Sequence, residues 1–135
     1  MAIPRSKSQP KPRDVPCRAR PGTGKLVAGV AKDATRAGVL AAVLKALGHP
    51  DRLRILAFLL GRKEGNVSEI CRQLDLAQSV ASQQLAALRL HGLVRVRRDG
   101  GFRRYAVALP VVGDLVGCLA RCYAEHGSRL QHNVG

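Results

Sequence analysis

Apolar residues recur at helical spacing upstream of Gly48. Between residues 39 and 47, valine and leucine occupy positions three and four apart, which predicts a helix that ends at this glycine. Pro50 favours the start of a second helix, because proline fits the first helical turn. Leucine and isoleucine lie on most sides of residues 53–60, so we expect this second helix, which ends at Gly61, to form the centre of the core.

Two further helices follow, joined by a tight turn. Asn66 and Glu69 have the spacing of a capping box, and residues 67–74 carry an apolar stripe on one side, which predicts a short amphipathic helix. After a three-residue break, another helix is expected to begin at Gln78. It should stop at Gly92, because a glycine followed by an apolar residue suits a Schellman motif.

Beyond this helix the period of the pattern changes to two. Valine and arginine alternate over residues 94–97, as in a strand with one buried face. Asp99-Gly100-Gly101 provides a tight turn, and residues 102–109 complete a two-stranded hairpin. Pro110 opens a last helix, which is expected to run to about His126–Gly127.

A helix pair with a tight turn, followed at once by a basic hairpin, is typical of a winged helix-turn-helix. We therefore predict a mainly α fold of the α+β type, dimeric, with about five helices and a two-stranded hairpin as the wing. The second helix of the pair would enter the major groove of DNA and present four polar side chains: Gln78, Ser79, Ser82 and Gln83. The wing would present four guanidinium groups to phosphates or the minor groove: Arg97, Arg98, Arg103 and Arg104. The alternative is a solvated, charged hairpin on an unrelated α+β domain.

Composition supports nucleic acid as the partner. The chain has 135 residues and a mass of 14.5 kDa, which suits a single domain, and its low aromatic content of 3% favours an aliphatic, helical core. Lys and Arg number 23 against 9 acidic residues, giving a net charge of +14, and such a surface attracts polyanions. The sequence contains no nucleophile elbow, phosphate loop or paired carboxylates, so we do not expect an enzyme. A non-specific, architectural nucleic-acid-binding protein is an alternative.

The start of the chain differs from the rest. Residues 1–25 hold five prolines among basic residues and have little to bury, which predicts a disordered basic arm ahead of a DNA-binding and dimerisation domain at 26–130. The arm would lie along DNA phosphates or remain a solvated tail. The four cysteines are too sparse for a disulfide framework, and no apolar run resembles a signal peptide or a membrane span. We therefore expect a cytoplasmic protein with no membrane partner.

Four segments together resemble the ArsR/SmtB family of bacterial winged-helix repressors. The segments are ALGHPDRLRIL (46–56), VSEIC (67–71), LAQSVASQQL (76–85) and LRLHGLV (88–94). The resemblance covers roughly residues 36–125 and implies a homodimer whose first and last helices form the subunit interface. It also implies that the dimer binds an inverted repeat in double-stranded DNA and leaves it when an effector occupies a sensor site. One departure is Gln84, where the family usually has histidine.

The resemblance also directs attention to the cysteines. Many family members sense metal through a Cys-x-Cys pair at the start of the third helix, where this chain has Asn66 and Ser68, so that site is in doubt. Cys71 lies nearby on the apolar stripe and is expected to fill the core. In the last helix, Cys118 and Cys122 are one turn apart on one face, and two thiolates suit a thiophilic ion such as As(III), Cd(II) or Hg(II).

The sequence thus predicts a sequence-specific transcriptional repressor that an effector releases from its operator through cysteine thiols, with As(III) or another thiophilic ion as the first expectation. As(III) would want a third sulfur, from Cys17 or from the other subunit. A second reading is a redox or reactive-sulfur sensor, because Arg121 between Cys118 and Cys122 could favour a thiolate. In a third reading the two cysteines only fill space in an interface helix.

Overall fold

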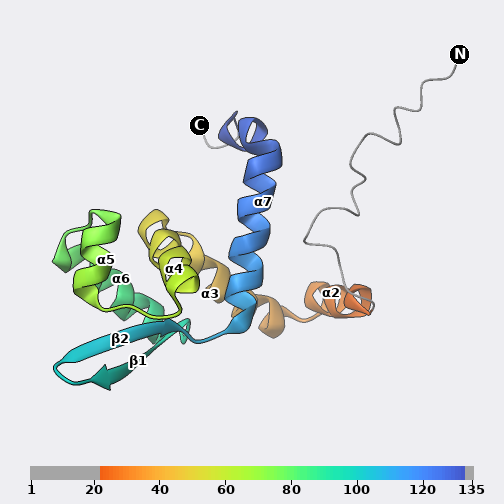
Figure 1. The fold of residues 1–135 in the computed structure, drawn as a ribbon. Coiled ribbons are helices and arrows are strands. Elements are labelled where there is room, and N and C mark those ends of the chain that lie inside the picture. Colours follow the sequence, from red (N-terminus) through yellow and green to blue (C-terminus); the bar gives the residue numbers. More distant parts are fainter. Residues whose placement is uncertain (1–21, 133–135) are drawn as a thin grey trace, which may run out of the picture.

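Six helices and one antiparallel hairpin make up residues 22–132, the part of the chain that the computed structural model describes (Figure 1). The helices are α2 (Thr23–Lys32), α3 (Ala34–Leu47), α4 (Pro50–Arg62), α5 (Val67–Leu74), α6 (Gln78–Leu90) and α7 (Pro110–His132). The strands are β1 (Val94–Asp99) and β2 (Phe102–Val107). The predicted mainly α fold with a two-stranded wing is confirmed.

The additional helix is α2, which the sequence analysis did not predict. Its first turn, from Thr23, overlaps the end of the predicted arm at 1–25, and the rest of that arm lies outside the described residues. The apolar residues of α2 are helically spaced, but none of its side chains is buried. The helix therefore lacks the buried stripe that makes an element easy to recognise from a sequence.

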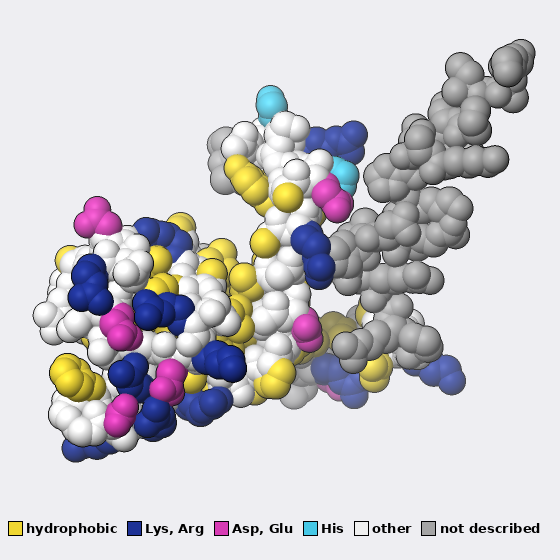
Figure 2. Space-filling view, in the orientation of Figure 1, with side chains coloured by type: hydrophobic (Ala, Val, Ile, Leu, Met, Phe, Trp, Pro, Cys, Tyr) yellow, Lys and Arg dark blue, Asp and Glu magenta, His cyan; other side chains and the backbone are white. Residues whose placement is uncertain are grey.

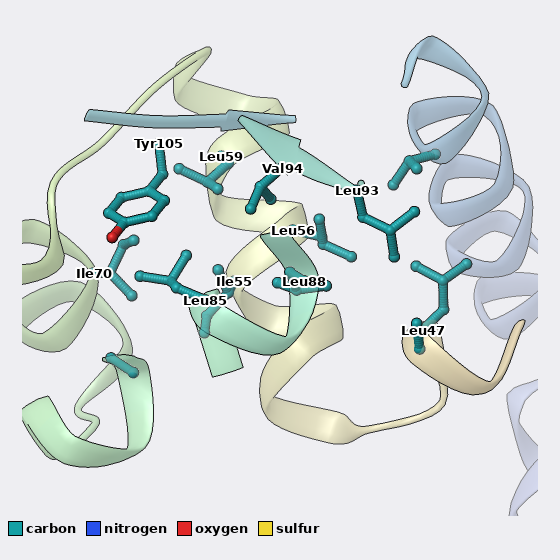
Figure 3. Close-up of a cluster of buried hydrophobic side chains, with 13 residues drawn as sticks. Leu47, Ile55, Leu56, Leu59, Ile70, Leu85, Leu88, Leu93, Val94 and Tyr105 are labelled. Carbon is teal, nitrogen blue, oxygen red and sulfur yellow. The ribbon is translucent and has the colours of Figure 1, made fainter. Parts of the chain in front are cut away.

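The core surrounds α4, as predicted. Ile55, Leu56 and Leu59 of this helix are completely buried. Figure 3 shows them among side chains from α5, α6 and the hairpin, including Ile70, Leu85, Leu88, Leu93, Val94 and Tyr105. Because α5 and α6 both pack against this cluster, their relative angle is fixed by apolar contact.

Local hydrogen bonds set the ends of the helix pair. The Asn66 side chain accepts from the Glu69 backbone N–H at 2.8 Å, and the Glu69 carboxylate accepts from the Asn66 N–H at 3.0 Å, which completes the predicted capping box. At the end of α6, Gly92 has a φ of 70° and donates to the Arg89 carbonyl at 3.0 Å, while Leu93 donates to the Leu88 carbonyl at 2.9 Å. This is the predicted Schellman motif, and it turns the chain from α6 into β1.

The wing is tied to the body at its base. The backbones of Gly65 and Tyr105 exchange two hydrogen bonds, of 3.0 and 2.8 Å, which join β2 to the loop between α4 and α5. A Cβ on Gly65 would lie 3.0 Å from the Phe58 ring, so this close approach needs glycine. The wing is thus held near its base by the loop between α4 and α5 and by packing on α4 and α6, while its tip projects from the body of the domain (Figure 1).

The last helix extends beyond its predicted end. The expected stop at His126–Gly127 corresponds to a kink, since His126 has non-helical angles (φ −132°, ψ 21°), but α7 resumes and continues to His132. Across the kink, the Gln131 side-chain amide donates to the Tyr123 hydroxyl at 2.9 Å. The predicted end of the helix therefore coincides with the break at His126, and the residues up to His132 form a short continuation beyond it.

Within residues 22–132, no helix combines the length and the apolarity that a bilayer crossing requires.

Candidate nucleic-acid interface

One face of α6 is polar and open to solvent. Ala81, Leu85 and Leu88 of this helix are buried in the core. The opposite face carries the four side chains predicted to meet base edges, and all four are exposed: Gln78, Ser79, Ser82 and Gln83. Since glutamine can pair with adenine and serine can donate to bases or phosphates, this face has the chemistry of a recognition helix.

The exposed face of α6 borders a groove that the wing closes on its other side. The groove has a volume of about 670 Å³ and is lined by Val67, Ser82, Ala86, Arg89, Leu90, Arg103 and Tyr105. Basic side chains from the helix and from β2 therefore face the same hollow. This is the arrangement needed to hold a phosphate backbone between helix and wing.

Arg89 is the functional candidate that the sequence analysis missed. It is exposed and lies two turns beyond Ser82 on the same face of α6. It also lines a second, smaller hollow of about 110 Å³ with Arg98 and Arg103 of the wing. The spacing of seven residues between Ser82 and Arg89 already indicated that both lie on one face of the helix. In the sequence analysis, the residues around Arg89 were used only to predict where the helix ends.

The four predicted wing arginines fall into two pairs. Arg97 makes a bidentate ion pair with Glu64, with Nη2 at 2.6 Å from Oε1 and Nε at 3.1 Å from Oε2. Arg104 donates from Nε to Asp99 at 3.0 Å and lies 3.8 Å from Glu69. Both side chains thus act first within the protein, where they brace the wing.

The other pair is Arg98 and Arg103. Within residues 22–132, neither Arg98 nor Arg103 has an acidic side chain at ion-pair distance. Both are exposed, and they lie opposite each other in the register of the hairpin. Basic side chains gather over the hairpin and the adjacent helices in Figure 2. Arg98 and Arg103 are consequently the wing residues most available to phosphate.

The ion pair at the base of the wing perturbs both partners. The hydrogen bond from Arg97 lowers the pKa of the Glu64 carboxyl below its ordinary value. In turn, the Glu64 carboxylate raises the pKa of Arg97. Both directions are those expected for an ion pair that favours the charged form of each partner.

The cysteines occupy different environments. Cys71 is half-buried and packs against the core, as predicted. At the start of α5, where the Cys-x-Cys site was in doubt, Asn66 caps the helix. Cys122 on α7 is a half-buried free thiol, whereas Cys118, one turn earlier, is disulfide-bonded. No group of three or more His, Cys, Asp or Glu side chains suited to a metal ion occurs in the described range.

The helices at the far side from α5 and the wing leave apolar side chains exposed. On α3 these are Val39, Leu40 and Leu44, and on α7 they are Val111, Leu119, Tyr123 and Leu130. Exposed apolar residues at this density on two helices are typical of a surface that a protein partner covers.

The chain is similar to known transcriptional regulators. A family profile described as a helix-turn-helix domain matches residues 47–97. The HTH-type transcriptional regulator YgaV of Escherichia coli (strain K12) is 36% identical over 83 residues, which are 62% of this chain and 84% of the relative. A probable mercury resistance operon repressor of Streptomyces lividans is 40% identical over 90 residues, covering 67% of this chain and 70% of the relative.

Solved structures agree with these sequence relatives. Reduced HlyU from Vibrio cholerae N16961 superposes with a TM-score of 0.62 at 34% identity, covering 67% of this chain and 94% of that one. The transcriptional repressor BigR from Xylella fastidiosa gives a TM-score of 0.60 at 32% identity, covering 69% and 91%. The exposed polar face of α6, the basic wing and these likenesses lead to one conclusion: the chain belongs to the helix-turn-helix family of transcriptional regulators, and it has the winged form of that fold.

Proposed function

We propose that this protein is a repressor of the ArsR/SmtB type that binds an inverted-repeat DNA operator as a homodimer and releases it in response to an effector sensed by cysteine thiols. The observation that carries the proposal is the exposed polar face of α6 beside a wing whose Arg98 and Arg103 have no carboxylate partner in the described part of the chain. Since its target is DNA, we place the protein in the cytoplasm.

In this proposal, α6 reads bases and the wing holds the backbone. Gln78, Ser79, Ser82 and Gln83 would meet base edges in the major groove. Arg89, Arg98 and Arg103 would neutralise phosphates on either side of the groove between α6 and β2. Arg97 and Arg104, both assigned to DNA by the sequence, would support the wing from within the protein.

The dimer would form through the exposed apolar faces of α3 and α7. One recognition helix covers only a few base pairs, so two copies about 34 Å apart are needed for a long, specific site. A two-fold dimer accounts for both the apolar surface and the symmetry of the proposed operator.

For the effector we propose a thiophilic metal ion or metalloid such as As(III), with Cys118 and Cys122 as ligands. The relative from Streptomyces lividans, named as a mercury resistance operon repressor, supports a thiophilic ion. The fit is incomplete, because two sulfurs do not fill the preference of As(III) for three, and the described residues contain no three-donor cluster. Cys118 would also have to be reduced before it could bind an ion.

A redox or reactive-sulfur sensor is the second candidate. Cys118 is disulfide-bonded while Cys122, one turn away, is a free thiol, so the two cysteines of α7 differ in oxidation state. One of the solved relatives is HlyU in a reduced form, which supports a redox response as the alternative.

The experiment that tests the proposal has two stages. First, the protein is bound to a pool of random duplexes at fixed salt, and bound sequences are enriched. A sequence-specific repressor should enrich one inverted repeat over random DNA by about a thousandfold or more, whereas an architectural protein would enrich none.

In the second stage, release from the enriched duplex is measured with As(III), Cd(II), Zn(II), Hg(II), peroxide and polysulfide. We expect Cys118→Ser and Cys122→Ser to bind the duplex normally but to resist release by the active compound. Cys71→Ser is the matched control, expected to change thermal stability more than response. Wild-type dose dependence in both α7 variants would place the sensor elsewhere.

A further inference from the structure

An aromatic side chain projects from the tip of the wing. Phe102 begins β2 and is 60% exposed, although the whole chain contains only two phenylalanines and two tyrosines. Phe58 and Tyr105 pack on the core, which is where aromatic residues normally contribute. An aromatic ring that is mostly exposed beside the tip of a basic hairpin buries little apolar surface on folding, and this position is typical of a side chain that contacts a ligand.

The turn that carries Phe102 is unusually slim. Asp99 pairs with Phe102, and the loop between them is Gly100-Gly101. Gly100 needs to be glycine because its φ is +63°, as in the first position of a type II′ turn. Gly101 has no such requirement, and a Cβ at either position would meet nothing within 4 Å. Gly101 therefore keeps the tip free of side chains, although its backbone conformation does not require glycine.

Positive charge brackets the ring. Arg98 and Arg103 are directly opposite each other in the strand register, next to the Asp99–Phe102 pair. Both arginines line a hollow of about 180 Å³ with Gly100, Gly101 and Phe102. Like charges directly opposite destabilise a hairpin. The equivalent pair one step inward, Arg97 and Arg104, is compensated by carboxylates.

We propose that Phe102 is an apolar wedge that enters the minor groove and partly unstacks one base step of the operator. Arg98 and Arg103 would bind the phosphates on the two sides of the groove, which relieves their mutual repulsion. The inference rests on the proposed function, because it requires the wing to lie on DNA. Charge decides between DNA and a protein partner here. The hollow beside the ring is lined by the glycine tip and by Arg98 and Arg103, which have no carboxylate partner among the described residues, and not by other apolar side chains. Asp99, opposite Phe102 in the register, is held by Arg104 at 3.0 Å.

If Phe102 acts as a wedge, the protein should prefer certain bases at operator positions where no side chain forms hydrogen bonds with a base. Unstacking costs least at flexible pyrimidine–purine steps such as TA and CA. A dimer would place one wedge at each outer end of its operator, beyond the bases that α6 contacts. The enriched duplexes should therefore show symmetric TA or CA steps flanking the inverted repeat.

The test compares wild type, Phe102→Ala and Phe102→Leu on the same random duplex pool. We expect Phe102→Ala to retain the central inverted repeat but to lose the flanking preference. It should bind the wild-type duplex about tenfold more weakly, because the stacking of the ring on a base is lost. The salt dependence of binding should not change, because every phosphate contact is retained. Phe102→Leu, still apolar, should retain part of the flanking preference.

A fluorescent base analogue gives a direct readout. With 2-aminopurine placed in the flanking step, wild type should raise its fluorescence as the base unstacks, and Phe102→Ala should not. Arg103→Ala is the matched control, expected to reduce the salt dependence of binding while the flanking preference remains. Thermal melting of each variant checks that the fold is intact.

The outcomes separate this inference from the proposed function. Suppose that wild type enriches an inverted repeat and that Phe102→Ala shows the same flanking-base preference, operator affinity and 2-aminopurine fluorescence. The proposal that Phe102 is a wedge is then wrong, and the proposal of a repressor stands. If wild type enriches no sequence at all, both proposals fall.

Discussion

Arg52 on α4 donates a hydrogen bond from Nε to Oε1 of Gln84 on α6, at 2.8 Å. The same guanidinium donates from Nη1 to the carbonyl of Ala46, in the last turn of α3, at 3.0 Å. One partly buried side chain thus joins the helix expected to form the dimer to the helix expected to read DNA. It also gives Gln84 a defined structural role at the position where the resembling family usually has histidine.

Removal of this link should destabilise the domain. We expect Arg52→Ala to lower the free energy of unfolding by about 1 to 3 kcal/mol, because it leaves the Gln84 amide and the Ala46 carbonyl partly buried without their donor. Urea denaturation measures the change. Arg72→Ala, an exposed arginine on α5, is the control and should alter stability by less than about 0.5 kcal/mol. Equal effects of the two substitutions would show that the link contributes nothing.

Replacement of Glu64 by alanine distinguishes two roles of Arg97, because the two roles predict opposite changes in operator affinity. If Arg97 braces the wing, Glu64→Ala should weaken operator binding even though it removes a negative charge from a DNA-binding protein. If Arg97 is instead a phosphate contact restrained by Glu64, the same substitution should strengthen binding. We expect the first result, measured as the operator Kd at fixed salt, with Glu125→Ala on α7 as the charge-matched control.

The same pair responds to pH in a defined direction. Because Arg97 lowers the pKa of Glu64, the ion pair contributes to stability above the ordinary glutamate pKa of about 4.3, and this contribution is lost as the pH falls through the lowered value. An NMR titration of the Glu64 carboxyl carbon should show a lower midpoint in wild type than in Arg97→Ala. Identical midpoints would mean that the pair does not form in solution.

The exposed glutamine of α6 and the basic side chains of the groove should differ in their effect on sequence specificity. Gln83→Ala should relax the preference at one base position by about 1 to 3 kcal/mol. Arg89→Ala and Arg103→Ala should weaken binding to all sequences alike and reduce the salt slope by about 1 each. Binding to the operator and to random duplexes over a salt series tests both statements. Uniform loss in all three variants would argue against base readout by Gln83.

Dimer formation can be separated from DNA contact. Leu44 on α3 and Leu119 on α7 are exposed apolar side chains in the proposed interface. Replacement of either by Glu should give a monomer in sedimentation at micromolar concentration and weaken operator binding by about a hundredfold or more, as bivalent contact is lost. Leu90→Glu is the matched control: Leu90 is 84% exposed but lies on α6, so this variant should remain a dimer. A wild-type monomer with full operator affinity would contradict the dimer.

Much of the fold was predictable because its boundaries are set by local hydrogen bonds. The Asn66 capping box and the Gly92 Schellman motif use residues three to five positions apart. Such contacts join residues that are close together in the sequence, so the sequence alone determined these helix ends. The exposed face of α6 followed in the same way from the spacing of its apolar residues.

The tertiary structure alone decided which polar residues remain available. Arg97 and Arg103 are equivalent in the sequence pattern, but Glu64, 33 positions before Arg97, neutralises the first and not the second. Arg52 finds Gln84 at a separation of 32 positions. The spacing along α6 places Arg89 on the same face as Ser82, but only the groove shows that it lies beside Arg103 of the wing. Ion pairs and grooves depend on which distant segments pack together around the core. The periodicity of the sequence does not predict those contacts.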